Sequence, residues 1–176
     1  MFKKFNISSF KKMKPPGDNT FDTSQEIKAL SKIPLRKEFV KKYDDIEAAF
    51  NKTAKDNNVK DYDKKIAAKL IKDSAPVILE LKKHHNRPRP YELDKNLKHF
   101  KMKSMETASY PSGHSVQGIL IAKVLGDKHP KAKSAFMKTA NNISDSRNIA
   151  HAHYKSDSDM GKKLGKSMYN HIKNKI

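Results

Sequence analysis

The chain has no cysteine among its 176 residues. It therefore has no disulfide framework, no thiol nucleophile and no thiolate metal site, and this lack is consistent with a reducing compartment. No stretch approaches the ~20 apolar residues that a membrane-spanning helix requires. The N-terminal residues 1–7 lack the apolar core of a secretory signal. We therefore predict that the chain has no transmembrane helix and lies in the cytoplasm.

Acidic residues are scarce: 19 Asp and Glu stand against 38 Lys and Arg, which gives a formal net charge of +19. Such an excess attracts phosphorylated small molecules, and it is compatible with weak nonspecific binding to nucleic acid or to an anionic membrane surface. The lysines are spread along the chain rather than gathered in one arm. We expect most of them to form a solvated surface.

The length predicts a single domain, large enough to bury a core. Residues 1–19 combine phenylalanines with lysines and end at Pro15-Pro16-Gly17, which predicts a basic flexible arm. Residues 20–176 form the predicted helical domain. Whether the protein forms a homo-oligomer is left open at this point.

Apolar residues at helical spacing predict the secondary structure of this domain. The expected helices cover residues 24–31, 39–55, 61–82, 113–125, 131–141 and 157–174. Pro76 is expected to kink the third helix or to begin a new one. The broad apolar surface after Gly113 predicts a central helix, and Gly161 with Gly165 predicts a close helix contact. No segment has the pattern of a strand, so we predict an all-α, compact, single-domain helical bundle.

The segment from Ser146 to Asp157 contains a cation, an imidazole and a carboxylate: Arg147, His153 and Asp157. A carboxylate that holds one ring nitrogen of a histidine leaves the other free as a base or nucleophile. On one straight helix, Arg147 and His153 would point about 240° apart. They can share a site only if a helix ends between them. We therefore place His153 just outside the N-terminus of the last helix, where anions are favoured.

Two further motifs precede this segment. A Pro-Ser-Gly-His sequence at 111–114 stands directly before an apolar helical run, and Lys82 is followed after six residues by Arg89-Pro90. The two prolines at 88 and 90 predict an extended segment, because each biases the preceding residue away from the helical region. For the neighbouring cations Lys83 and Arg87 we expect simple solvent exposure.

Lys-x6-Arg-Pro, Pro-Ser-Gly-His and Ser-Arg-x5-His-x3-Asp, in this order, resemble the signature of one superfamily. It comprises the type 2 phosphatidic acid phosphatases, the bacterial class A non-specific acid phosphatases and the vanadium haloperoxidases. The resemblance extends from about Lys82 to Gly165 and is most similar to the class A acid phosphatases. It implies their helical bundle and a phosphatase that hydrolyses phosphomonoesters.

The resemblance also implies roles for individual residues. His153 is the expected nucleophile that forms a phosphohistidine, Asp157 fixes its ring, and His114 is the general acid and then the base. The expected phosphate ligands are Lys82, Arg89, Ser112, Gly113 and Arg147. No metal or other cofactor is expected, and vanadate is expected to inhibit. His84, His85 and His151 match no motif position, and we expect them to be loop histidines near the substrate.

Two alternatives remain at this stage. The same pocket holds vanadate as a cofactor in the haloperoxidases, although those relatives are much longer. A different class is a basic nucleic-acid-binding protein with a vestigial site. The expected partner is a phosphorylated small molecule, which is a soluble ester, a nucleotide or a lipid phosphate.

Overall fold

The computed structural model describes residues 1–175, so Ile176 at the end of the predicted domain lies outside the described residues. The described chain is helical throughout and contains no strand, as the sequence predicts. The elements are α1 (Ser8–Lys12), α2 (Phe21–Ser31), α3 (Lys37–Asp44), α4 (Ile46–Asp56), α5 (Lys65–His85), α6 (Pro90–Leu93), η1 (Lys103–Glu106), α7 (Gly113–Lys128), η2 (Pro130–Ala132), α8 (Lys133–Ile149) and α9 (Lys155–Ile172).

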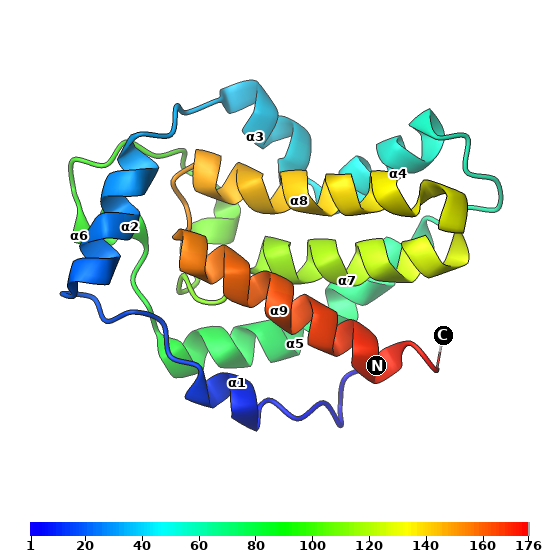
Figure 1. The fold of residues 1–176 in the computed structure, drawn as a ribbon, viewed down its shortest axis with the longest axis horizontal. Coiled ribbons are helices and arrows are strands. Elements are labelled where there is room, and N and C mark those ends of the chain that lie inside the picture. The colour runs from blue at the N-terminus through cyan, green and yellow to red at the C-terminus, as the bar shows by residue number, and fades with distance from the viewer. Residues whose placement is uncertain (176) are drawn as a thin grey trace.

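The centre of the bundle is α7, which lies between α8 and α9 and also contacts α5 and α4 (Figure 1). Its apolar side chains point in several directions, and those of Val116, Leu120 and Leu125 are completely buried. A helix that is apolar around most of its circumference is stable only when other helices cover it. The predicted central helix is therefore confirmed.

Two glycines bring α9 against α7. A Cβ atom added to Gly161 would lie 2.6 Å from the carbonyl oxygen of Ser112, and one added to Gly165 would meet the carbonyl oxygen of Val116. Real Cβ atoms do not approach backbone oxygens so closely, so larger residues would push the helices apart. The contact expected from the glycine spacing is confirmed, and it holds the start of α9 beside the start of α7.

Helix α5 continues through Pro76, where the sequence predicts a kink or a new start. The helix ends at Asn86, whose φ of 44° lies in the left-handed region that asparagine tolerates better than most residues. Arg89 follows with an extended backbone, φ −73° and ψ 158°, as the flanking prolines predict. This turn brings Lys82 and Arg89 from one continuous stretch toward the same part of the molecule.

The helix predicted over residues 39–55 is broken in two at Asp45. This residue has an extended backbone, with φ −85° and ψ 104°, and its carboxylate accepts a hydrogen bond from the backbone N–H of Ala48. An aspartate that caps a new helix ends the previous one, and this local signal was missed. The break leaves Asp44 at the end of α3, where it faces the site described below.

Residues 1–19 differ from the predicted flexible arm because they pack against the domain. Phe2 and Phe10 are buried in the main core. The hydroxyl of Tyr110 donates to the carbonyl oxygen of Met13 at 2.8 Å, and α1 lies against α5 (Figure 1). The aromatic residues outweigh the lysines here, since burial of a phenylalanine contributes about 1.5–3 kcal/mol.

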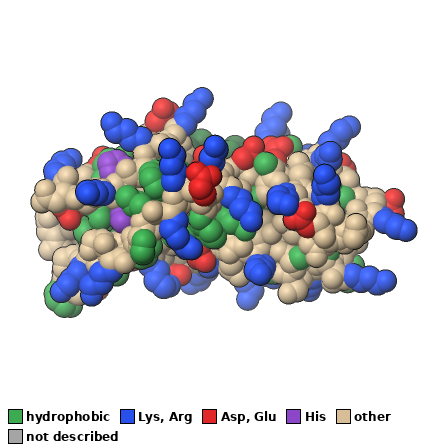
Figure 2. All heavy atoms as spheres, turned by 90° about the horizontal axis from the view of Figure 1, so that it is seen from above, with side chains coloured by type: hydrophobic (Ala, Val, Ile, Leu, Met, Phe, Trp, Pro, Cys, Tyr) green, Lys and Arg blue, Asp and Glu red, His purple; other side chains and the backbone are tan. Residues whose placement is uncertain are grey.

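The surface charge is dispersed, as the sequence predicts. Figure 2 shows lysine and arginine side chains scattered over the face in view, with acidic side chains between them. The cations that the motifs contain behave differently. Lys82, Arg89 and Arg147 are all buried, although burying a charge is costly unless hydrogen bonds or counter-charges compensate.

Candidate active site

His153 lies in the short turn between α8 and α9, two residues before the first residue of α9. The turn is fixed by two hydrogen bonds, from the N–H of Ala152 to the carbonyl of Arg147 at 3.0 Å and from the Asn148 amide to the carbonyl of His153 at 2.9 Å. The helix end expected between Arg147 and His153 is therefore confirmed. His153 stands just outside the N-terminus of the last helix, and Asp157 lies in the first turn of that helix.

The two ring nitrogens of His153 have different partners. Nδ1 lies 3.0 Å from Oδ2 of Asp157, and Nε2 lies 3.0 Å from Nη1 of Arg89. A guanidinium can only donate, so Nε2 must accept and the ring proton must be on Nδ1. Burial, together with the charges of Arg89 and Lys82, lowers the pKa of His153 to about 3. The ring is thus neutral near pH 7, with its lone pair on Nε2.

The Asp157 carboxylate is completely buried and fully hydrogen-bonded. Besides His153, Oδ2 accepts from the hydroxyl of Ser109 and from the N–H of Tyr154. Oδ1 accepts from Nη1 of Arg87 at 2.7 Å. Burial alone raises the pKa of Asp157, but the hydrogen bonds from His153 and Ser109 and the charge of Arg87 bring it below its ordinary value. Asp157 is therefore an ionised carboxylate that holds His153 in one tautomer.

The prediction that Arg87 is exposed to solvent is wrong. Arg87 is 2% exposed, and its guanidinium bonds Asp157 and Glu26. Ser109 is also part of the site and was not predicted. Arg87 could have been found from its spacing, because residues two apart on an extended segment point to the same side, and Arg89 is two residues further on. Lys83 is exposed, as predicted.

Lys82 and Arg89 are directed at backbone oxygens around the site. The Lys82 ammonium donates to the carbonyl of Ala108, and burial, together with the charge of Arg89, lowers its pKa to about 7. The Arg89 guanidinium uses all of its N–H groups: Nη1 bonds His153 and the carbonyl of Ala152, while Nε and Nη2 bond the carbonyls of Thr107 and Ser104. An anion that binds Arg89 must therefore replace one of these partners.

The Pro-Ser-Gly-His motif forms the N-terminus of α7. The Ser112 hydroxyl caps this helix by accepting from the N–H of Ser115, and the Ser112 N–H donates to the carbonyl of Asp157 at 3.0 Å. The free amides of a helix N-terminus favour an anion. A Cβ on Gly113 would meet a methyl of Ile78 at 3.5 Å, an ordinary contact. Packing therefore does not require glycine at this position.

Arg147 and His114 meet through Asp44 at the end of α3. Arg147 Nη1 lies 2.8 Å from the Asp44 carboxylate, and Nε2 of His114 donates to the Asp44 carbonyl at 2.9 Å. Nη2 of Arg147 is buried and has no hydrogen-bond partner within residues 1–175. Burial, together with the charge of Arg147, lowers the pKa of His114 to about 4. The Asp44 side chain thus lies close to His114, the expected general acid.

The remaining histidines of interest lie away from these groups. Both ring nitrogens of His151 approach backbone carbonyls, of Lys98 at 2.6 Å and of Ile33 at 2.9 Å. The rings of His84 and His85 contact carbonyls of α1. His151 connects two loops, as expected, whereas His84 and His85 lie in the last turn of α5 and not in a loop, so that expectation is wrong for these two. Within residues 1–175, no group of three or more His, Asp or Glu side chains is arranged to hold a metal ion.

The structure therefore places the three motifs at one location. Arg89 contacts His153, Ser112 contacts Asp157, and Asp44 joins His114 to Arg147. All of the predicted site residues come from the end of α5 and the turn after it, the start of α7, and the junction of α8 and α9. Their chemical roles remain predictions at this point.

Comparison with known proteins gives a local match and a shared fold. No family model matches the chain. A non-specific acid phosphatase from Salmonella typhimurium (strain LT2) is 37% identical over 60 residues, which are 34% of this chain and 24% of that protein. A PAP2-type phosphatidylglycerolphosphate phosphatase from Bacillus subtilis, described as transmembrane, has a similar structure with a TM-score of 0.64 and 19% identity. The match covers 99% of this chain and 96% of that chain.

The prediction of a cytoplasmic location is wrong in the light of this comparison. The Bacillus subtilis protein has this fold and is described as transmembrane, so the bundle itself does not indicate a cytoplasmic protein. Within the described residues, no helix combines the length and the apolar character needed to cross a membrane. In fold, in the local match and in its three motifs, the chain resembles the superfamily of the type 2 phosphatidic acid phosphatases and the class A non-specific acid phosphatases.

Proposed function

We propose that this protein is a phosphatase that hydrolyses phosphomonoesters through a phosphohistidine on His153, without a metal ion. The observation that supports this most strongly is the environment of His153. The ring is neutral, its tautomer is fixed by Asp157 and Arg89, and its Nε2 lone pair faces buried cations. A nucleophile needs an unprotonated lone pair, and a phosphoryl group needs the cations.

Binding of the ester would rearrange the cations around the phosphoryl group. The unpartnered Nη2 of Arg147 is available to one oxygen. If Arg89 turns its Nη1 donor from His153 to a second oxygen, the Nε2 lone pair becomes free. Lys82 and the N-terminal amides of α7 supply further positive charge. The phosphate therefore does two things: it satisfies the buried donors and it exposes the nucleophile.

In the first chemical step, Nε2 of His153 attacks phosphorus and the bond to the ester oxygen breaks. The leaving oxygen takes a proton from His114, which must be protonated for this role. The low pKa of His114 in the free site comes from burial and then from Arg147. A phosphoryl dianion bound to Arg147 offsets that charge, so substrate binding raises the pKa of His114 and favours the acid form.

In the second step, water attacks the phosphohistidine and His114 takes the proton of that water. The N–P bond breaks, and the pair of electrons returns to Nε2 of His153. Asp157 remains ionised in both steps because Arg87 and the hydrogen bonds of the site stabilise its charge. Inorganic phosphate leaves, and Arg89 returns to Nε2.

Phosphate release from a generic aryl phosphate ester tests this proposal. We expect turnover in the absence of added metal and in the presence of a chelator, and we expect none for His153→Ala. The exposed Arg36→Gln variant is a suitable control because it changes a charge away from His153. Activity that a chelator abolishes and a divalent metal alone restores would contradict the proposal.

A further inference from the structure

Arg87 links the carboxylate behind His153 to a helix that no motif includes. Its Nη1 lies 2.7 Å from Oδ1 of Asp157 and 2.7 Å from the hydroxyl of Ser156, and its Nη2 lies 3.1 Å from Glu26 on α2. The guanidinium carbon lies 3.7 Å from the centre of the Tyr154 ring. The position of Arg87 is thus fixed by two carboxylates, a hydroxyl and an aromatic face.

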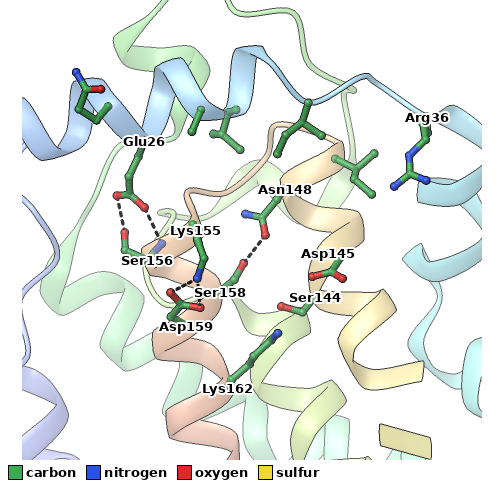
Figure 3. A pocket seen from close by; sticks show the side chains of 15 residues that line it. Glu26, Arg36, Ser144, Asp145, Asn148, Lys155, Ser156, Ser158, Asp159 and Lys162 are labelled. Atoms are coloured by element: carbon green, nitrogen blue, oxygen red, sulfur yellow. Dashed lines mark hydrogen bonds and ion pairs between the residues drawn. The ribbon is translucent and has the colours of Figure 1, made fainter. Parts of the chain in front are cut away.

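Glu26 on α2 binds both Arg87 and Ser156. One of its oxygens accepts from the backbone N–H of Ser156 and the other from the Ser156 hydroxyl, each at 2.7 Å, and Figure 3 shows this contact between α2 and the start of α9. Beyond this contact, α2, the segment after it, α8 and α9 line an open pocket of about 670 Å³. Glu26 therefore holds Arg87 and the first turn of α9 together at the edge of a space that is not packed.

The charge of Arg87 is needed for the state of Asp157. A completely buried carboxylate is strongly destabilised unless a counter-charge lies beside it. His153 is neutral, and Arg89 and Lys82 direct their hydrogen bonds elsewhere. Within the described residues, no lysine or arginine other than Arg87 forms an ion pair with Asp157. It also binds Oδ1, which leaves Oδ2 for His153.

We propose that Arg87, held by Glu26 and Ser156, is a positioning residue that keeps Asp157 ionised and oriented so that the Nε2 lone pair of His153 is available. Arg87 does not touch the phosphoryl site, and it acts only through Asp157. This inference rests on the proposed function for its effect on turnover. Its effect on the His153 ring does not depend on that function.

The ¹⁵N NMR signals of the histidine rings test the inference, with His153 assigned from a His153→Gln spectrum. In the wild type we expect a neutral ring with the proton on Nδ1 that titrates only in strong acid. Arg87→Gln removes a positive charge, so the pair of His153 and Asp157 should take up a proton at a higher pH. The groups that face His153, namely Arg89, Lys82, Asp157 and Ser109, are unchanged in this variant.

Kinetics give a second readout. Arg87→Gln should lower kcat about 10–100-fold, by analogy with residues that orient the ligands of metal ions, with little change in KM. Arg87→Lys keeps the charge and should restore part of both the titration and kcat. The matched control is Arg36→Gln, because Arg36 is also an arginine over an aromatic ring, Phe39 at 4.7 Å, but is exposed. It should leave both readouts unchanged.

The outcomes separate the possible failures. If Arg87→Gln does not fold by circular dichroism, Arg87→Lys and Glu26→Gln decide the question by the same titration. Folded variants with a lower melting temperature but an unchanged His153 titration and unchanged kcat would overturn the inference. If the wild type shows no phosphatase activity, the proposed function fails, while the NMR titration still tests the link from Arg87 to His153.

Discussion

The two histidines of the site are held very differently. The His153 side chain is 5% exposed and its Asp157 partner 0%, whereas the His114 side chain is 16% exposed and its Asp44 partner 48%. Both ring nitrogens of His153 and both carboxylate oxygens of Asp157 have hydrogen-bond partners, and the tautomer follows from them. Around His114, a partly exposed aspartate covers a buried arginine that still has a free donor.

This difference separates a half in which the His153 ring and Asp157 are already oriented, and only Arg89 has to turn, from a half whose ion pair substrate must rearrange. Catalysis benefits from groups that are oriented before the reaction, because no energy is then needed to reorganise them. The His153 ring and the Asp157 carboxylate meet that condition. In the other half, His114 has a low pKa and lies beside Asp44. A phosphoryl dianion bound to Arg147 would raise that pKa and replace Asp44 as the partner of the arginine. We therefore expect substitutions in the second half to have effects that depend on the substrate and on pH.

His114→Ala should produce the largest difference between substrates. We expect turnover of alkyl phosphates to fall about 10²–10⁴-fold, the usual contribution of general acid catalysis. Aryl phosphates with acidic leaving groups should lose much less, because their leaving oxygen needs less protonation. Comparison of kcat for the two ester classes checks this. Equal losses for both classes would exclude His114 as the acid.

Arg147→Ala should weaken inhibition by vanadate. Orthovanadate can adopt a trigonal bipyramid with His153 in an axial position, so a site complementary to the transition state should bind it tightly and competitively. Loss of one such cation is expected to cost about 10²–10³-fold, and Arg89→Ala should act in the same direction. The inhibition constants measure this. Peroxide-dependent bromide oxidation in the presence of vanadate, without phosphatase activity in its absence, would instead favour the haloperoxidase alternative.

The pH dependence should distinguish the two histidines. In the free protein His153 must be neutral, with a pKa of about 3, and His114 must be protonated, with a pKa of about 4. Above the pKa of His114 its acid form declines about tenfold per pH unit, so kcat/KM should be highest in acid and should fall as pH rises. Above pH 7, neutralisation of Lys82 should weaken phosphate binding further. A profile of kcat/KM that rises from pH 4 to pH 7 would contradict these assignments.

Asp44→Asn should have the smallest effect, and it should improve substrate binding where the other substitutions impair the enzyme. Asp44 is a partly exposed carboxylate that pairs with Arg147 at 2.8 Å, so in the proposed mechanism it would compete with phosphate for this cation. Such pairs contribute about 0.2–1 kcal/mol, so we expect KM to fall by a factor of about 1.4 to 5. Asp45→Asn is the matched control, since it changes the same charge one residue away and asparagine can still cap α4. A KM that does not change, or that changes equally in both variants, would show that Asp44 does not compete.

The resemblance to the superfamily supplied the site residues, and local chemistry made part of their geometry predictable from the sequence. The separation of Arg147 and His153 correctly required a helix end between them, although the helix predicted over residues 131–141 stops short of the observed end of α8 at Ile149. The prolines at 88 and 90 led to the extended Arg89. In each case, neighbouring residues determine the geometry, so no knowledge of the tertiary fold is necessary.

The features that the sequence did not reveal depend on distant contacts. Arg87 is buried only because Glu26 and Asp157 approach it from α2 and α9. Asp44 reaches Arg147 only because α3 packs on α8. The spacing of Arg87 and Arg89 and the capping pattern at Asp45 were present in the sequence. Neither pattern indicates which residues Arg87 and Asp44 contact, because those partners are set by the packing of the helices.

The most direct test of the account is to trap the covalent intermediate during turnover. The protein is mixed with a ³²P-labelled phosphomonoester and quenched in alkali, because phosphohistidine is labile in acid, and the labelled residue is located by mass spectrometry. The account predicts label on His153, and none in the His153→Ala protein. Label on His114 would reverse the roles of the two histidines, and turnover without label on any histidine would contradict the proposed mechanism.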